Sequence, residues 1–392
     1  MNWKKVLLIA FALVLTMGLV ACANEEPEVA VVDDPAIEDV GEPLNIVVVS
    51  SPSGVDDGSF NQNVYEGAQA FIAAGGNATV TSVVEPEMDN AVAAVEQIVG
   101  NYDVVLLPGF QFVGITEVAR NNPDTMFVLV DALPANPDFD ADAEEGPDNQ
   151  RNVELPNVYA MLFAEQESGF LAGIAAAMET ETGKVAFVGG MAIPPVVNYH
   201  LGFESGVTFA NENLGTDAEI VNLSAFAGSD TVAGNYVGAF NDPARGKQVG
   251  DALIADGVDI MFVAAGGSGN GAFTAAKEAE DVMVIGCDVN QWHLGEDGDR
   301  NIVLTSVLKV MDLNVQRQLE AIVAGTFVGG NYTLQADTDS TGFVYAEGQQ
   351  QLDADTITAM SEAFDAIKAG TIVPAGAFSD FGPDDFPGLN EE

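Results

Sequence analysis

Polar side chains suited to ligand binding gather where the first apolar run of the chain ends. The run "LNIVVVS" is followed by Ser51 and then by "DDGSFNQ", which carries Asp57, Phe60 and Asn61 where helical spacing begins. Carboxylate, hydroxyl and amide groups can bind the polar edge of a planar molecule, while an aromatic ring stacks on its face. The stretch therefore indicates one wall of a binding site.

Two carboxylates end later apolar runs in the same way. Asp131 follows "MFVLV" and Asp288 follows "VMVIGC". Ligands of open α/β sheets bind beyond the carboxyl ends of the strands, so both residues are candidates for the same site. The two oxygens of Asp288 can accept hydrogen bonds from a ribose diol. Further aromatic residues lie in or beside the predicted strand-end loops: Phe110, Phe112, Phe226, Phe240 and Trp292.

A glycine-rich turn, "GGSGNG", contains Gly267 and follows the run "IMFVAA". Glycines at such a turn can bring backbone N–H groups close to a phosphate, as in dinucleotide-binding proteins. The spacing here is G-x-G-x-G, which departs from the G-x-G-x-x-G of those proteins. We therefore favour a tight turn that lets a neutral ligand approach a helix N-terminus.

Signals of catalysis are few. The chain has two histidines, and neither belongs to a zinc-type His-x-x-x-His pair. The G-x-S-x-G motif of serine hydrolases is absent. With 12 Lys and Arg against 60 Asp and Glu, the formal charge of −48 repels nucleic acids. The sequence thus predicts a binding protein with no enzyme activity, metal site, cofactor or nucleic-acid partner.

The order of the elements indicates the fold class. Ten short β-branched runs alternate with segments of helical spacing, which predicts parallel β-α-β units and an α/β fold with doubly wound sheets. Ten strands are too many for one lobe, so we expect two sheets of five or six strands. The polar stretch 132–157 reads as a long loop before the chain crosses into the second lobe.

The N-terminal residues 1–22 predict export. Lys4 and Lys5 precede an apolar core that ends in "LVAC", which resembles a bacterial lipobox with Cys22 as the lipidated residue. A plain secretory signal with an incidental cysteine is the alternative. Residues 23–43 are acidic, contain prolines and predict a flexible tether. We expect a chain held outside the cytoplasmic membrane by its lipid, because two acyl chains anchor stably.

Several long blocks together resemble the basic membrane protein family, the purine nucleoside receptor A-like lipoproteins of ABC transporters. They are "DDGSFNQNVYEGAQAF", "FAEQESGFLAGIAAAMETETGKVAFVGG", "GAFNDPARGKQVGDALIADGVDIMFVAAGGSGNG" and "VIGCDVNQW". The resemblance implies a type I periplasmic-binding-protein fold, with two doubly wound Rossmann-like lobes joined by a hinge. We place the N-terminal lobe at 44–158 with a returning segment near 289–325. The C-terminal lobe is then 159–288 with part of 326–392.

The resemblance also implies roles for individual residues. A nucleoside base would stack between Phe60 and Phe240. Asn61 and Asp131 match positions that read the base. The sugar would meet three further residues: Asp288 at its hydroxyls, the backbone of Gly267, and Lys309 at the sugar or its carboxylate partner.

One departure from the family pattern concerns the choice of base. The family has an aspartate just after the first strand, where this chain reads "SSPSGVDD". Either Ser51 takes this place, or Asp57 substitutes for the missing carboxylate. A hydroxyl donates or accepts a hydrogen bond whereas an ionised carboxylate only accepts, so the preferred base can differ.

The function implied is that of a lipid-anchored, monomeric nucleoside receptor of an ABC importer. Its partners would be the permease and ATPase subunits, with the membrane contacted through the lipid. A receptor for a sugar or another small solute on the same fold is the nearest alternative. An exported nucleoside hydrolase or phosphorylase, and a sensor or adhesion lipoprotein without ligand, remain open as further alternatives.

Overall fold

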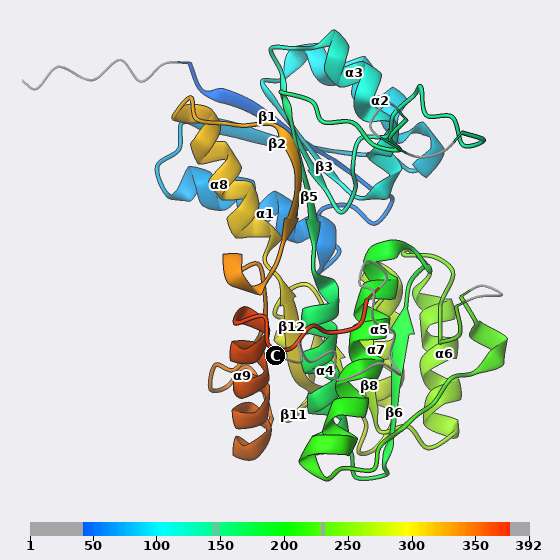
Figure 1. The fold of residues 1–392 in the computed structure, drawn as a ribbon. Helices are drawn as coiled ribbons and strands as arrows, with labels where there is room; N and C mark the ends of the chain where they lie inside the picture. The colour runs from blue at the N-terminus through cyan, green and yellow to red at the C-terminus, as the bar shows by residue number, and fades with distance from the viewer. Residues whose placement is uncertain (1–41, 144–145, 147–148, 229–231, 377–392) are drawn as a thin grey trace, which may run out of the picture. The chain divides into compact units, whose positions relative to one another are not determined.

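The computed structural model describes residues 42–143, 146, 149–228 and 232–376 (Figure 1). The predicted signal peptide, Cys22 and nearly all of the tether lie outside these ranges. Every helix within them is too short or too polar to cross a membrane.

The first lobe is built on a six-stranded parallel sheet of order β13-β5-β4-β3-β1-β2. Its strands are β1 (Leu44–Ser50), β2 (Ala78–Val84), β3 (Val104–Pro108), β4 (Met126–Val130), β5 (Val158–Phe163) and β13 (Gly330–Leu334). Its helices are α1 (Phe60–Ala73), α2 (Ala91–Ile98), α3 (Thr116–Asn121) and α8 (Met311–Val323).

Alternate residues of β1 explain why this sheet is covered on both faces. Ile46 and Val48 pack with side chains of α1 and α8, whereas Val47 and Val49 pack with side chains of α2 and α3. Side chains of successive strand residues point to opposite faces, so a continuous apolar run needs apolar cover on each face. The predicted doubly wound arrangement is confirmed.

The second lobe has a six-stranded sheet of order β14-β12-β9-β8-β6-β7, parallel except for β14. Its strands are β6 (Lys184–Gly189), β7 (Glu219–Ile220), β8 (Ile260–Ala264), β9 (Met283–Gly286), β12 (Val303–Lys309) and β14 (Thr341–Phe343). A two-stranded hairpin lies beside it: β10 (Glu296–Asp297) and β11 (Arg300–Asn301).

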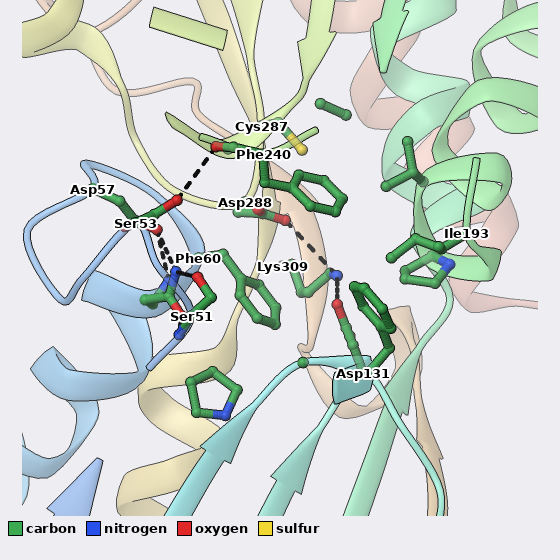
Figure 2. Close-up of a pocket in the computed structure, with 18 of the residues that line it drawn as sticks. Ser51, Ser53, Asp57, Phe60, Asp131, Ile193, Phe240, Cys287, Asp288 and Lys309 are labelled. Carbon is green, nitrogen blue, oxygen red and sulfur yellow. Dashed lines mark hydrogen bonds and ion pairs between the residues drawn. The ribbon is translucent and has the colours of Figure 1, made fainter. Parts of the chain in front are cut away.

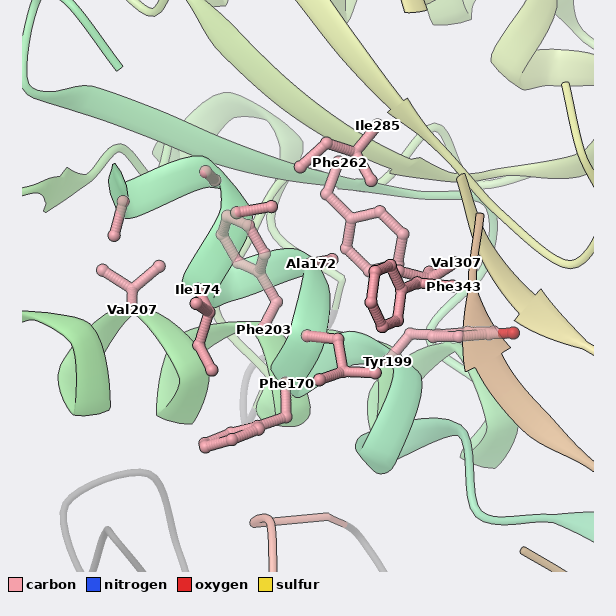
Figure 3. Packing of buried hydrophobic residues seen from close by; sticks show 14 of the residues in the cluster. Phe170, Ala172, Ile174, Tyr199, Phe203, Val207, Phe262, Ile285, Val307 and Phe343 are labelled. Carbon is pink, nitrogen blue, oxygen red and sulfur yellow. The ribbon is translucent and has the colours of Figure 1, made fainter. Parts of the chain in front are cut away.

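Five helices cover the two faces of this sheet. They are α4 (Glu165–Glu179), α5 (Pro194–Phe209), α6 (Pro243–Ala255), α7 (Gly269–Glu278) and α9 (Ala354–Lys368). Side chains of α4, α5 and α9 form one core with Phe187 and Phe262, and Figure 3 shows Phe203 beside Phe262. Residues of α6 and α7 form the other core with Ala186 and Val188.

The chain crosses between the sheets at three places, and these differ from the predicted lobe boundaries. The loop 132–157 leads into β5, which pairs with β4 of the first sheet, so the first crossing comes only after Phe163. Within 289–325, β12 belongs to the second sheet and only α8 packs on the first lobe. β13 then returns to the first sheet before β14 joins the second. Its sequence, "GNYTL", lacks the apolar run that identified the central strands.

Helices α4 and α5 touch through glycines at four-residue spacing. A Cβ atom on Gly169 or Gly173 of α4 would overlap backbone oxygens of α5, and one on Gly202 or Gly206 of α5 would overlap those of α4. Small residues let helix backbones approach closely, which leaves little freedom to slide. Because α4 begins at Glu165 and α5 carries Tyr199, this contact fixes two side chains near the ends of the strands.

The substitution Gly206→Ala tests the helix contact. Its Cβ would overlap the Phe170 carbonyl oxygen. We expect a loss of about 1–3 kcal/mol of unfolding free energy from overpacking, measured by chemical denaturation. Gly100→Ala is the matched control, because a Cβ there meets no atom within 4 Å. Equal stability of both variants would contradict the close contact.

Candidate functional site

A cavity lies where the carboxyl ends of strands from both sheets meet (Figure 2). It encloses about 700 Å³ of empty space including its open mouth. The lining residues come from both lobes: Ser51, Ser53, Asp57, Phe60, Asn61, Met88, Pro108, Gly109, Phe110, Gln111, Asp131, Ile193, Pro195, Val196, Tyr199, Phe240, Ala264, Gly266, Cys287, Asp288 and Lys309.

All of the predicted ligand-binding residues except Gly267 line this cavity. Its neighbour Gly266 does so instead, with a φ of +52° at the start of a short 3-10 turn. Gly267 lies behind it, where an added Cβ would come 3.1 Å from the Phe240 carbonyl oxygen and 3.5 Å from Ser53 Oγ. The glycine turn therefore borders the cavity one residue earlier than expected.

The strand-end aromatic residues divide into two groups. Phe60, Phe110 and Phe240 line the cavity, and Figure 2 shows Phe60 and Phe240 reaching into it from different lobes. Phe112 is fully buried in the first lobe. Phe226 and Trp292 pack against the second-lobe core formed with α6 and α7. The prediction of aromatic walls thus applies to half of the set.

The loop after β1 is organised around the buried Asp57 carboxylate. One oxygen accepts hydrogen bonds from the backbone N–H groups of Ser59 (3.0 Å) and Gln62 (3.1 Å). The other accepts from the backbone N–H (3.2 Å) and side-chain amide (2.7 Å) of Asn61. Burial raises the pKa of Asp57 although these hydrogen bonds oppose the shift. Four donors use the acceptor positions of one carboxylate, so Asp57 stabilises the start of α1 at the border of the cavity.

Ser51 is the residue of this loop that keeps a donor for a ligand. Its hydroxyl oxygen accepts from the Asn61 side-chain amide at 3.1 Å, and its backbone N–H donates to Asn61 Oδ1 at 3.3 Å. No hydrogen bond described for Ser51 uses its hydroxyl hydrogen. The edge of the cavity beside Phe60 therefore offers a hydroxyl donor and the remaining lone pair of the Asn61 oxygen.

A buried cluster of one lysine and three carboxylates lies across the cavity. Lys309 Nζ is 2.5 Å from Asp131 Oδ2, 3.1 Å from Glu165 Oε1 and 3.9 Å from Asp288 Oδ1. Figure 2 shows the links of Lys309 to Asp131 and Asp288. The Lys309 side chain is 3% exposed and that of Glu165 is 2% exposed. The ammonium thus joins Asp131 of the first lobe to carboxylates at the start of α4 and the end of β9.

Burial and charge act against each other in this cluster. For Lys309, burial lowers the pKa, but the charges of Asp131, Glu165 and Asp288 outweigh it and raise the pKa above its usual range. For Glu165, burial raises the pKa to about 8; Lys309 opposes the shift and Asp131 adds to it. Burial also raises the pKa of Asp131 against the opposing charge of Lys309. The lysine remains charged, and Glu165 and Asp131 hold protons more tightly than ordinary carboxyl groups.

Asp131 and Asp288 share a rare backbone conformation. Both lie in the left-handed region, with φ of +59° and +67°, which costs free energy for residues other than glycine. Asp288 accepts hydrogen bonds from Tyr199 Oη (3.0 Å) and Ser59 Oγ (3.4 Å). Each carboxylate is thus held at the end of its strand and turned toward the cavity it lines.

Glu165 and Tyr199 are site residues that sequence reasoning missed. Glu165 follows the run "VYAMLF" by two residues, so the strand-end rule could have found it. Tyr199 lies inside α5 and carries no such signal. It reaches the cavity because α5 packs tightly against α4, and this contact cannot be read from local spacing.

The sequence of this chain matches a known protein family. The family model of PnrA-like ABC transporter substrate-binding proteins matches residues 44–375. A CD4+ T-cell-stimulating antigen of Listeria innocua is 29% identical, covering 94% of this chain and 98% of its own. An ABC transporter nucleoside-binding protein, BmpA, of Lactococcus lactis subsp. cremoris is 30% identical, covering 73% of this chain and 77% of its own.

Solved structures agree on the fold. A solute-binding protein of an ABC transporter system from Aeropyrum pernix K1 superposes with a TM-score of 0.70 at 25% identity, covering 86% of this chain and 95% of that one. A solute-binding protein from Conexibacter woesei gives 0.61 at 20% identity, covering 86% and 100%. These structures confirm the expected periplasmic-binding-protein fold, and the family match shows a role in substrate binding for ABC transport that is not enzymatic. This chain belongs to the PnrA-like, or basic membrane protein, family of ABC transporter substrate-binding proteins.

Proposed function

We propose that this substrate-binding protein is a lipid-anchored receptor that delivers a nucleoside, with a purine base preferred, to an ABC importer. The observation that carries the proposal is the combination, in one cavity, of Phe60 and Phe240 from different lobes with the Asp288 carboxylate, whose side chain is 12% exposed. Aromatic rings suit the faces of a base, and a carboxylate suits the diol of a ribose. The Lactococcus lactis relative is itself named a nucleoside-binding protein.

The two polar regions of the cavity suit different parts of such a ligand. Ser51 and Asn61 adjoin Phe60 and can bind the polar edge of a base. Asp288, with the Lys309 cluster behind it, can accept hydrogen bonds from the sugar hydroxyls. Asp131 contacts Lys309, which supports a role at the sugar end of the ligand in place of the base-reading role that the resemblance implied.

The position of the receptor in the cell rests on the family and on the N-terminal sequence. Substrate-binding proteins of ABC transporters act outside the cytoplasm with permease and ATPase subunits. The lipobox-like "LVAC" supports anchoring through lipidated Cys22. Ligand that contacts both lobes would favour their closure about the three chain crossings, and the closed form would dock on the permease. A monomer suffices for this mechanism.

The first test is a titration of the purified protein with adenosine, guanosine, inosine, cytidine and ribose, using calorimetry. We expect the purine nucleosides to bind most tightly, whereas tighter binding of ribose would favour a sugar receptor.

Phe60→Leu keeps apolar volume but removes the flat ring, so nucleoside affinity should fall roughly tenfold, equivalent to about 1.4 kcal/mol of stacking. Phe139→Leu, outside the cavity, is the control.

A second test concerns the sugar. Asp288→Asn replaces one acceptor oxygen with an amide donor, so it should weaken adenosine binding more than binding of 2′-deoxyadenosine. The measured quantity is the ratio of the two dissociation constants, which should move toward one. Asp355→Asn on the exposed side of α9 serves as the control. An unchanged ratio in Asp288→Asn would show that this carboxylate does not read the diol.

A further inference from the structure

The Lys309 cluster has an imbalance of charge. Asp131, Glu165 and Asp288 would contribute three negative charges against the single positive charge of Lys309 if all were ionised. The three carboxylate side chains are 7%, 2% and 12% exposed, so little solvent reaches them. A buried charge without a counter-charge is costly, and proteins relieve the cost by keeping a proton on one of the acids.

The surroundings of the three acids point to Glu165 as the one that keeps the proton. Asp288 accepts from two hydroxyl groups and is the most exposed, and Asp131 makes the shortest contact with Lys309. Glu165 is the most buried, and it shares Lys309 while accepting from the neutral amide of Asn198 at 2.9 Å.

Asp131 supplies independent evidence. Its Oδ1 atom is buried and has no donor partner, although its Oδ2 atom is bound to Lys309. The Glu165 carboxyl is a neighbour of Asp131, because Lys309 Nζ lies 3.1 Å from Glu165 Oε1 and 2.5 Å from Asp131 Oδ2. Two ionised carboxylates repel each other, whereas a protonated Glu165 would donate a hydrogen bond to Asp131.

We propose that Glu165 acts as a positioning residue in its neutral form, donating its carboxyl proton to Asp131 and thereby holding Asp131 and Lys309 at the sugar end of the ligand cavity. The effect on ligand rests on the proposed function, but the protonation itself does not. Glu165 would not touch the ligand, since it does not line the main cavity. It does line a neighbouring cavity that shares Phe110, Asp131 and Pro195 with the main one, which gives the proton a route to solvent.

The location of Glu165 gives its charge state consequences for the hinge. It opens α4 directly after the first crossing, and Lys309 ends β12 directly before the second. In the same turn of α4, Ser168 Oγ donates to the Leu308 carbonyl at 2.7 Å. Glu167 accepts from the Ala336 N–H at 2.8 Å and from Thr341 Oγ1 at 2.6 Å, on the third crossing. The first turns of α4 thus connect all three crossings.

The direction of the pH effect follows from this arrangement. The titratable groups that face Glu165 are Lys309, Asp131 and Tyr199, and burial raises the pKa of Tyr199, which keeps it neutral. Deprotonation of Glu165, with its pKa of about 8, adds a negative charge that only Lys309 opposes. A ligand that fills the cavity removes water from the cluster, so the ionised form should bind it more weakly.

The experiment compares the wild-type protein with Glu165→Gln, which imitates the neutral acid. The dissociation constant for adenosine is measured by calorimetry from about pH 6 to about pH 9.5, and in the wild type it should rise by up to about tenfold per pH unit above pH 8. In Glu165→Gln the rise should disappear while affinity at neutral pH is kept. Glu181→Gln, at an exposed residue, should retain the wild-type profile. A flat wild-type profile, or a rise that persists in Glu165→Gln, would overturn the proposal.

A ligand-free measurement separates this proposal from the proposed function. A folded-state pKa of about 8 lies above the unfolded value of about 4.3, so Glu165 favours folding at low pH and loses this contribution as pH rises through 8. Between about pH 4.3 and about pH 8, the unfolding free energy of the wild type should therefore fall more than that of Glu165→Gln. Infrared spectra of the wild type at neutral pH should also show a protonated carboxylic acid that Glu165→Gln lacks.

The outcomes of the two measurements are distinct. Parallel stability profiles and no such infrared band would overturn the neutral Glu165, whatever ligand binds. The expected profiles and band, with no nucleoside bound at any pH, would uphold the neutral acid and contradict the nucleoside receptor.

Discussion

The buried ammonium of Lys309 is the interaction on which the ligand cavity depends. Its nitrogen lies within ion-pair distance of Asp131 from the first lobe and also of Glu165 and Asp288. Removing one partner of a buried ion pair leaves an uncompensated charge, so Lys309 and Asp131, which make the shortest contact of the cluster, depend on each other. Glu165 and Lys309 stand beside the chain crossings, so a change of charge in this cluster also acts on the segments that join the two lobes.

The rest of the fold can be understood as the support of this cluster. Parallel strands bring Asp131, Asp288 and Lys309 to the carboxyl edges of the two sheets. The glycine contact between α4 and α5 holds Glu165 and Tyr199 in place, since helices that touch through their backbones cannot slide. A site preorganised in this way needs little rearrangement of its polar groups when ligand arrives, which favours affinity.

Much of the fold followed from local pattern. Central strands such as β1 and β8 are buried on both faces and appear in the sequence as continuous apolar runs, so the α/β class and two sheets of five or six strands were predictable. β13 and β14 were missed because one has a mixed pattern and the other is three residues long. The lobe boundaries depended on these edge strands and on the pairing of β5, and were therefore misplaced.

The sequence by itself determined which residues stand at strand ends, and with them Ser51, Phe60, Asp131, Asp288 and Lys309, because chain order places them there. Tertiary structure alone decided their partners. In the folded chain, the oxygens of Asp57 accept hydrogen bonds from N–H groups at the start of α1, and Lys309 lies near three carboxylates from separate segments. Tertiary structure also brought in Tyr199 from inside a helix. The physical reason is that burial and ion pairing depend on distances between segments far apart in the chain, which local composition does not encode.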